Sequence, residues 1–421
     1  SIAVTGVTSG QYGNDATYQV IVTASEALDG EATLVLGGGT VGSGSGSGGG
    51  SATIWTYTFT PTDADEAVTI NIAAGGITDA AGNDNTAAAT QFLFTHDQTD
   101  PTATLTSTHV NTGGSYNGAV TLTLTFNEEM TGIADGDITV GNARCTLSAY
   151  TVATANTVFT QVCGGSGYTN GETITISVAA SAGTDPAGNG NTAATDFTWT
   201  YDTTVPTVTS IAVTGVTSGQ YGTAATYQVI VTGSETLEDA PTLVLGGGSI
   251  TTAGAGSSSD AVWTYTFTPT DNDEAVTIDI AAGGITDAAG NDNTAAATQF
   301  AFTHDRTAPT ITTVAVAGAT EDGYGVASTY VVTLTPSETL SAVPTLTVTG
   351  GTITTAGAAS SSDYVYTVTP SSADEAMTVV VAVGDATDSA GNANTAASNN
   401  YGWTHDATVP TMTITSSTVD S

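Results

Sequence analysis

Short runs with an apolar side chain at every second position follow one another along the chain. One such run places Tyr18, Val20 and Val22 on one side, and another spans residues 54–59. A period of two residues is that of a half-buried β-strand. No window of useful length has the helical period. Many short strands separated by regular turn signals predict an all-β fold, a sandwich or a barrel.

The same pattern of strands and turns returns at a fixed interval. An eight-residue motif of the form TDxAGNxN recurs with a spacing of 101 to 106 residues, at 78–85, 184–191, 286–293 and 387–394. A linker of the form Asp-x-Thr-x-Pro begins at Asp97, Asp202, Asp305 and Asp406. We therefore predict four domains and the first strand of a further repeat, at 1–97, 98–202, 203–305, 306–406 and 407–421. The chain opens inside a repeat, since residues 1–13 recur at 210–222.

The charge is strongly one-sided and changes what the repeats can do. Forty Asp and Glu face two basic residues, Arg144 and Arg306, for a net charge of −38. Such a chain repels nucleic acid and anionic lipid and attracts cations. Only 10% of the residues are charged, so this is not an acidic disordered tail. No run of 18 or more apolar residues occurs, so we expect no membrane span in this section.

Four motifs together resemble the bacterial Ig-like domains that occur in tandem in large surface proteins. They are the Ser-Glu or Asn-Glu-Glu turn (as at 127–129), the strand DGDITV at 135–140, the loop TDxAGN and the Asp-x-Thr-x-Pro linker. The resemblance covers essentially the whole chain. It implies a tandem array of Ig-like seven-stranded β-sandwiches, calcium at some junctions and no catalytic residues. Family members of this kind occur in adhesins, biofilm proteins and surface-layer proteins, so the resemblance implies an extracellular, cell-surface location.

The positions of the acids follow from strand direction. If seven strands alternate up and down, the second and sixth turns of each sandwich lie at the pole where the linker enters. The second turn carries a Glu and the sixth carries the Asp of the repeated motif. Each junction therefore gathers three acids that are distant in sequence. The fifth turn, as at Asp63, Asp65 and Glu66, faces the next domain and is a weaker candidate.

Several carboxylates without Lys or Arg repel one another, and a hard divalent cation removes that repulsion. Calcium takes six to eight oxygen ligands, and the absence of a Cys or His cluster argues against zinc. We predict calcium ligands at Asp97, Glu128, Glu129, Asp185, Asn189, Asp202, Glu235, Asp287, Asn291, Asp305, Glu338, Asp388 and Asn392, with an incomplete site at Glu26 and Asp79. The alternative is that Asp-x-x-Gly-Asn is only a tight turn, in which the Asp caps backbone amides.

Repeat two is the divergent member, and it holds both cysteines, Cys145 and Cys163. A disulfide between neighbouring strands is one interpretation and a pair of free thiols is the other. The acids repeat evenly instead of forming one unique pair, which argues against an enzyme. We expect a structural protein, a calcium-stiffened stalk, surface-layer or filament subunit that assembles with copies of itself. The alternative is an adhesive module that binds glycan or protein through repeat two, near Asp135 and Asp137.

Overall fold

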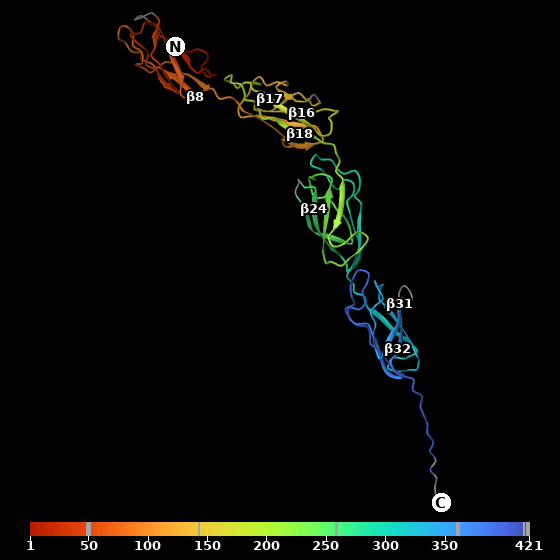
Figure 1. The fold of residues 1–421 in the computed structure, drawn as a ribbon. Helices are drawn as coiled ribbons and strands as arrows, with labels where there is room; N and C mark the ends of the chain where they lie inside the picture. The colour runs from red at the N-terminus through yellow and green to blue at the C-terminus, as the bar shows by residue number, and fades with distance from the viewer. Residues whose placement is uncertain (48–51, 142–143, 257–259, 359–362, 416, 418–421) are drawn as a thin grey trace. The chain divides into compact units, whose positions relative to one another are not determined.

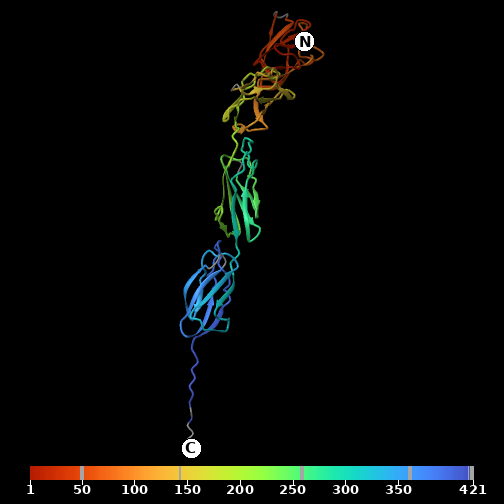
Figure 2. The same ribbon diagram turned by 90° about the vertical axis from the view of Figure 1, so that its right-hand side faces the viewer.

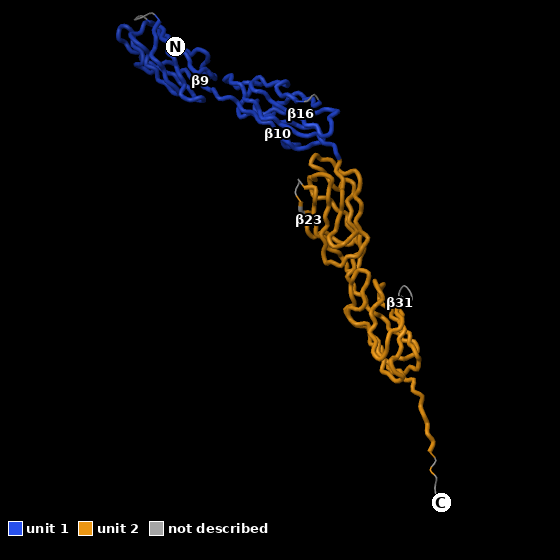
Figure 3. Tube along the Cα trace, viewed as in Figure 1, with its two compact units in different colours: residues 1–204 blue, residues 205–421 orange. Residues whose placement is uncertain are grey.

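The computed structural model describes residues 1–47, 52–141, 144–256, 260–358, 363–415 and 417. The chain divides into two compact units, Ser1–Thr204 and Val205–Ser421, and each contains two of the sequence repeats (Figure 3). Among the described residues there is no helix long and apolar enough to cross a membrane. The part of the chain that the structure describes has four hydrophobic cores, and the residues of each core come from a single repeat.

Repeat one is built from two facing sheets (Figure 1). The first sheet has the order β1 (Ile2–Val4), β3 (Tyr18–Thr23), β7 (Ile54–Pro61), β5 (Gly39–Val41), and β6 (Ser45–Gly46) also pairs with β7. The second has the order β2 (Tyr12–Gly13), β9 (Phe92–Asp97), β8 (Asp65–Asn71), β4 (Val35–Gly37). This strand order is that of an immunoglobulin-like sandwich, as the alternating pattern and the resemblance predicted.

The other three repeats have two sheets arranged in the same way. In repeat two the orders are β10 (Ala103–Ser107), β12 (Val120–Phe126), β16 (Val158–Gly164), β14 (Thr146–Leu147), with β15 (Thr151–Thr154) on β16, and β11 (Gly114–Tyr116), β18 (Phe197–Tyr201), β17 (Glu172–Val178), β13 (Ile138–Val140). In repeat three they are β19 (Val208–Val213), β21 (Tyr227–Gly233), β24 (Val262–Pro269), β23 (Gly248–Ala255), and β20 (Tyr221–Gly222), β26 (Phe300–Asp305), β25 (Asp273–Asp279), β22 (Val244–Gly246). In repeat four they are β27 (Ile311–Ala317), β29 (Tyr330–Pro336), β32 (Tyr364–Pro370), β31 (Gly351–Ala358), and β28 (Tyr324–Gly325), β34 (Tyr401–Asp406), β33 (Asp374–Val380), β30 (Thr347–Thr349). The turned view shows the strands of repeat three running along the length of its body (Figure 2).

The first strand of the expected seven is divided between the two sheets. In repeat one, β1 pairs antiparallel with β3, and β2 then pairs parallel with β9 in the other sheet. The crossing uses Gly6 and Gly10, whose φ angles are 85° and 87°. Residues other than glycine rarely adopt such angles, so the short Gly-containing segment lets the chain change sheets.

Part of the Gly/Ser-rich segment 42–51 forms a short strand of the first sheet of repeat one. Ser45 and Gly46 form β6, where Ser45 pairs with Thr56 and Gly46 with Trp55. The backbone therefore joins the sheet although the segment has no apolar side chain to bury. Residues 48–51 of this segment lie outside the described residues.

Repeat two differs from the others at the edge of its first sheet. Cys145 and Cys163 are joined by a disulfide with their Cα atoms 5.5 Å apart, so the disulfide interpretation holds. Cys163 belongs to β16, and both residues are buried in the core of the repeat. The bond anchors the segment before β14, which is only two residues long.

Residues 411–415 and 417, expected to begin a further repeat, form no strand. Their apolar side chains are exposed, with Met412 and Ile414 each 87% accessible. A single strand without a neighbour is not stable in water, so the extended segment has no ladder to join.

Candidate metal site at the repeat junctions

The repeated Asp-x-x-Gly-Asn segment forms a tight turn around its own aspartate. In repeat two, Oδ1 of Asp185 accepts hydrogen bonds from the amides of Gly188 (2.7 Å) and Asn189 (2.9 Å). Nδ2 of Asn189 donates to Oδ2 of Asp185 at 2.8 Å. Gly188 has a φ of 97°, which explains the glycine. The turn interpretation of the motif is therefore correct for its local structure.

This turn lies beside the second turn of the same sandwich, as strand direction predicted. Bridges of one residue pair join the two turns in every repeat, at Leu28–Asp79, Thr131–Thr184, Leu237–Asp287 and Leu340–Asp388. The Glu of the second turn and the Asp of the sixth turn are thus brought to the same pole, although about 50 residues separate them in sequence.

The linker that enters repeat two is hydrogen-bonded to this pole. Nδ2 of Asn189 donates to the backbone oxygen of Asp97 at 2.8 Å, and the amide of Thr192 donates to the oxygen of Pro101 at 2.8 Å. The amide of Thr102 donates to Oδ1 of Asn127 at 2.7 Å. The linker acid is therefore held against the turns of the following domain.

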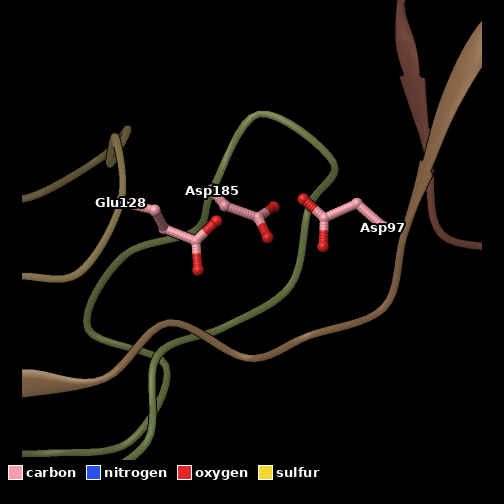
Figure 4. Close-up of side chains that lie close together, drawn as sticks. All are labelled: Asp97, Glu128 and Asp185. Carbon is pink, nitrogen blue, oxygen red and sulfur yellow. The ribbon is translucent and has the colours of Figure 1, made fainter. Parts of the chain in front are cut away.

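The result is a cluster of three carboxylates within the first unit. Ligand atoms of Asp97, Glu128 and Asp185 all lie within 4.8 Å of one another. Figure 4 shows their carboxylates directed at one another, each from a different segment of the chain. Asp97 and Glu128 are partly accessible, whereas Asp185 is only 2% exposed.

The second unit contains a cluster of the same composition. Asp305, Glu338 and Asp388 also have ligand atoms within 4.8 Å of one another. Nδ2 of Asn392 donates to the backbone oxygen of Asp305 at 3.0 Å and to Oδ2 of Asp388 at 2.9 Å. The geometry of the first cluster is thus repeated with the same residue types.

Not every predicted ligand joins a cluster. Glu129 is exposed, and its Oε1 accepts a hydrogen bond from Nδ2 of Asn156 at 3.2 Å. Glu26 and Asp79 line one pocket with Asn83, and the described residues of its lining include no linker acid. The set of Asp202 with Glu235, Asp287 and Asn291 takes its residues from both units, and it stays a prediction from the sequence.

Two asparagines occupy the clusters as donors. In the structure Nδ2 of Asn189 points to the carboxylates, while its Oδ1 accepts from Nδ2 of Asn14 at 3.2 Å. A metal ligand role, as predicted for Asn189 and Asn392, needs the opposite amide orientation, in which Oδ1 faces the acids. Rotation of the amide by 180° exchanges the two atoms without moving the backbone.

Burial and mutual repulsion act on the carboxylates of both clusters. Burial, followed by the charges of Asp97 and Asp185, raises the pKa of Glu128. Burial also raises the pKa of Asp97, and the charge of Asp185 adds to this effect. In the second unit, the pKa values of Asp305 and Glu338 are raised for the same reasons. The all-oxygen donor set and its unfavourable ionisation fit a hard divalent cation.

A fourth acid, which the sequence indicated only weakly, lies next to each cluster. Asp65 pairs with Asp97 across β8 and β9, and its Oδ2 accepts a hydrogen bond from Oγ1 of Thr99 at 2.5 Å. This hydrogen bond lowers the pKa of Asp65. In the second unit Asp273 has the same relation to Thr307. The signal in the sequence was an Asp three residues before the first buried apolar residue of the same strand, as at Asp65 and Val68 on β8 and at Asp273 and Val276 on β25.

The raised pKa values give a prediction for stability in the absence of divalent cations. Because Glu128 and Asp97 have a higher pKa folded than unfolded, the folded state binds more protons. The stability that these two groups contribute to the folded state is therefore fully present below the ordinary carboxyl pKa of about 4. It is lost as pH rises through their folded pKa values. In EDTA, we expect Glu128→Gln to gain stability relative to the parent chain between pH 4 and pH 7. Thermal melts at a series of pH values test this, and a pH-independent difference would contradict it.

The comparisons with known proteins agree with this architecture. Residues 2–95 and 97–201 each match the family described as bacterial Ig-like domain. Repeats one and two are therefore bacterial Ig-like domains. Repeats three and four have the same sheet order as repeat one. No match was found among curated protein sequences.

Several solved structures match the chain at low sequence identity and with TM-scores below 0.5. The bacterial integrin-binding protein invasin is 12% identical, with 96% of this chain and 78% of that chain covered and a TM-score of 0.32. Immunoglobulin domains 1–5 of Sidekick-1 are 11% identical, with 96% and 80% covered and a TM-score of 0.24. An endo-fucoidan hydrolase of glycoside hydrolase family 107 is 14% identical, with 73% and 44% covered and a TM-score of 0.26.

Proposed function

We propose that the chain is part of an extracellular structural protein in which calcium stiffens a row of Ig-like domains. The observation that carries the proposal is the repeated carboxylate cluster at a linker, Asp97 with Glu128 and Asp185 and again Asp305 with Glu338 and Asp388. One acid of each cluster ends the preceding domain, and the other two belong to the following domain. A cation bound by all three would therefore join two domains.

Charge supports the same proposal. With a net charge of −38 and no lysine, neighbouring domains repel one another over a Debye length of about 8 Å at physiological salt. Divalent cations at the linkers remove this repulsion where it is strongest. The bacterial Ig-like family, which the chain belongs to by its first two repeats, supports a role at the cell surface as a stalk, surface-layer or filament subunit.

Small-angle scattering with and without calcium tests the proposed stiffening. We expect calcium to narrow the distribution of chain dimensions, because each occupied linker loses its freedom to bend, and EDTA to broaden it again. A matched series in magnesium and in sodium chloride separates specific binding from screening. A distribution of chain dimensions that is the same in calcium and in EDTA would contradict the proposal.

An adhesive role for repeat two is the second candidate. This repeat holds both cysteines of the chain, which form the disulfide, and all four residues of its strand β15 are exposed. Binding of a glycan or protein ligand that is lost on substitution in β15, and retained in EDTA, would favour this candidate over the structural one.

A further inference from the structure

Strand β31 of repeat four is a long sheet edge, and no described strand pairs with its outer side. It is the last strand in the order β27-β29-β32-β31, and it is hydrogen-bonded to β32 on one side (labelled in Figure 1). The strand has eight residues, and five consecutive ones, 352–356, are exposed. Ile353 among them is 39% accessible. The outer row of backbone amides and carbonyls is therefore presented over most of the strand.

This edge has few of the features that keep sheet edges from pairing. Natural sheets protect their edges with charged side chains, proline, short strands or bulges. The sequence of β31, GTITTAGA, contains no charge and no proline. It has one irregularity, between Ile353 and Thr355, after which the pairing from Thr355 to Ala358 is regular. In repeat one the corresponding strands β5 and β6 have only three and two residues.

Charge indicates what kind of partner fits this edge. The four strands of this sheet, β27, β29, β32 and β31, contain no charged residue, although the whole chain has a net charge of −38. A second copy of the chain can approach here without bringing carboxylates of the two sheets together. If two copies of β31 pair antiparallel over all eight residues, the twofold axis passes between Thr354 and Thr355, at the middle of the strand.

We propose that β31 is a homotypic pairing edge, through which two copies of this chain join by antiparallel strand addition. The two four-stranded sheets become one continuous sheet across the twofold axis. Main-chain hydrogen bonds supply the attraction, and Ile353 adds apolar contact. Strand β23 of repeat three carries the same residues, ITTAGA, but its pairing is irregular at two places. We therefore place the contact at β31.

Sedimentation equilibrium of the full chain tests the proposal. The experiment is carried out in 0.5 M NaCl with EDTA. EDTA removes calcium, and the salt shortens the Debye length to about 4 Å, so that repulsion between copies is screened without calcium. The outcome is therefore independent of the proposed metal sites. We expect reversible dimers of the parent chain. Thr354→Lys places two like charges beside the twofold axis, and we expect it to raise the dissociation constant at least tenfold. Thr354→Asp places two negative charges at the same position, and we expect it to raise the dissociation constant for the same reason.

Val331→Lys is the matched control. Val331 lies on β29, between β27 and β32, and is 40% exposed on the face of the same sheet. It introduces the same charge at a distance from the edge, and we expect its dissociation constant to equal that of the parent chain. A parent chain that stays monomeric at all concentrations would overturn the proposal. So would a Val331→Lys variant that loses dimers while Thr354→Lys retains them, since the copies would then pack through sheet faces.

Discussion

Replacing Glu128 by glutamine is expected to weaken calcium binding at the first cluster at least tenfold, a change of about 1.4 kcal/mol. Among the described residues, the Glu128 carboxylate accepts no hydrogen bond, so the substitution removes a charged ligand and leaves the turn intact. It also removes the cost of burying a charged carboxylate and the repulsion from Asp97 and Asp185, which together raise the pKa of Glu128. In EDTA at neutral pH, the variant should therefore melt at a slightly higher temperature than the parent chain. Isothermal titration calorimetry together with thermal melts in EDTA measures both quantities.

Glu129→Gln is the control for this substitution. It makes the same chemical change one residue away, at a side chain that contacts Asn156 outside the cluster. We expect calcium affinity to be unchanged. If Glu128→Gln and Glu129→Gln weaken binding equally, the cluster of Asp97, Glu128 and Asp185 does not hold the ion. Asp185→Asn distinguishes turn from ligand further, because its side-chain oxygen still accepts from the amides of residues 188 and 189.

Chelation of calcium is expected to lower the melting temperature by about 10 °C, for calcium at a hundred times its dissociation constant. Binding to the folded state alone then contributes about 2.7 kcal/mol per site, and 1 kcal/mol shifts the melting of a domain of this size by at least 4 °C. Differential scanning calorimetry in calcium, magnesium and EDTA measures the effect. The double variant Glu128→Gln, Glu338→Gln should lose most of it, since each unit then lacks one ligand.

The outcome that would contradict the chelation prediction is equally specific. A melting temperature that responds to sodium chloride as strongly as to calcium indicates that both salts act by general screening of the net charge of −38. A melting temperature that does not respond to either one indicates that the clusters tolerate their own repulsion. In both cases the Asp-x-x-Gly-Asn segment is a turn and no more.

Much of the fold could be predicted from local pattern. Alternation at Tyr18, Val20 and Val22 identifies a strand with one buried face, because successive side chains of a strand point to opposite sides. All three are at most 2% exposed. The period of about 100 residues and the turn signals then predict repeated sandwiches. The division of the first strand at Gly6 and Gly10 was not predicted, since either residue is equally compatible with a simple loop.

The buried histidines show how a local pattern acquires its meaning from tertiary contacts. His96 directly precedes the linker residue Asp97. In the structure it is 2% exposed, and its Nδ1 lies 3.0 Å from the hydroxyl of Tyr18 with the two rings edge to face. The same pair recurs at Tyr227 and His304. Tyr18 lies on β3 and His96 on β9, in different sheets, so only the packing of the two sheets brings the two residues together.

The sequence by itself determined the residue types at each junction: a Glu, two Asp and an Asn in every complete copy, with almost no basic residue to balance them. Strand direction alone was enough to place Glu128 and Asp185 at one pole. The tertiary structure decided that Glu128 and not Glu129 faces the linker, and that Asn189 meets it through Nδ2. It also placed Asp65 beside Asp97. These choices depend on side-chain direction within a turn, which alternates from one residue to the next and is set by the segments packed around it.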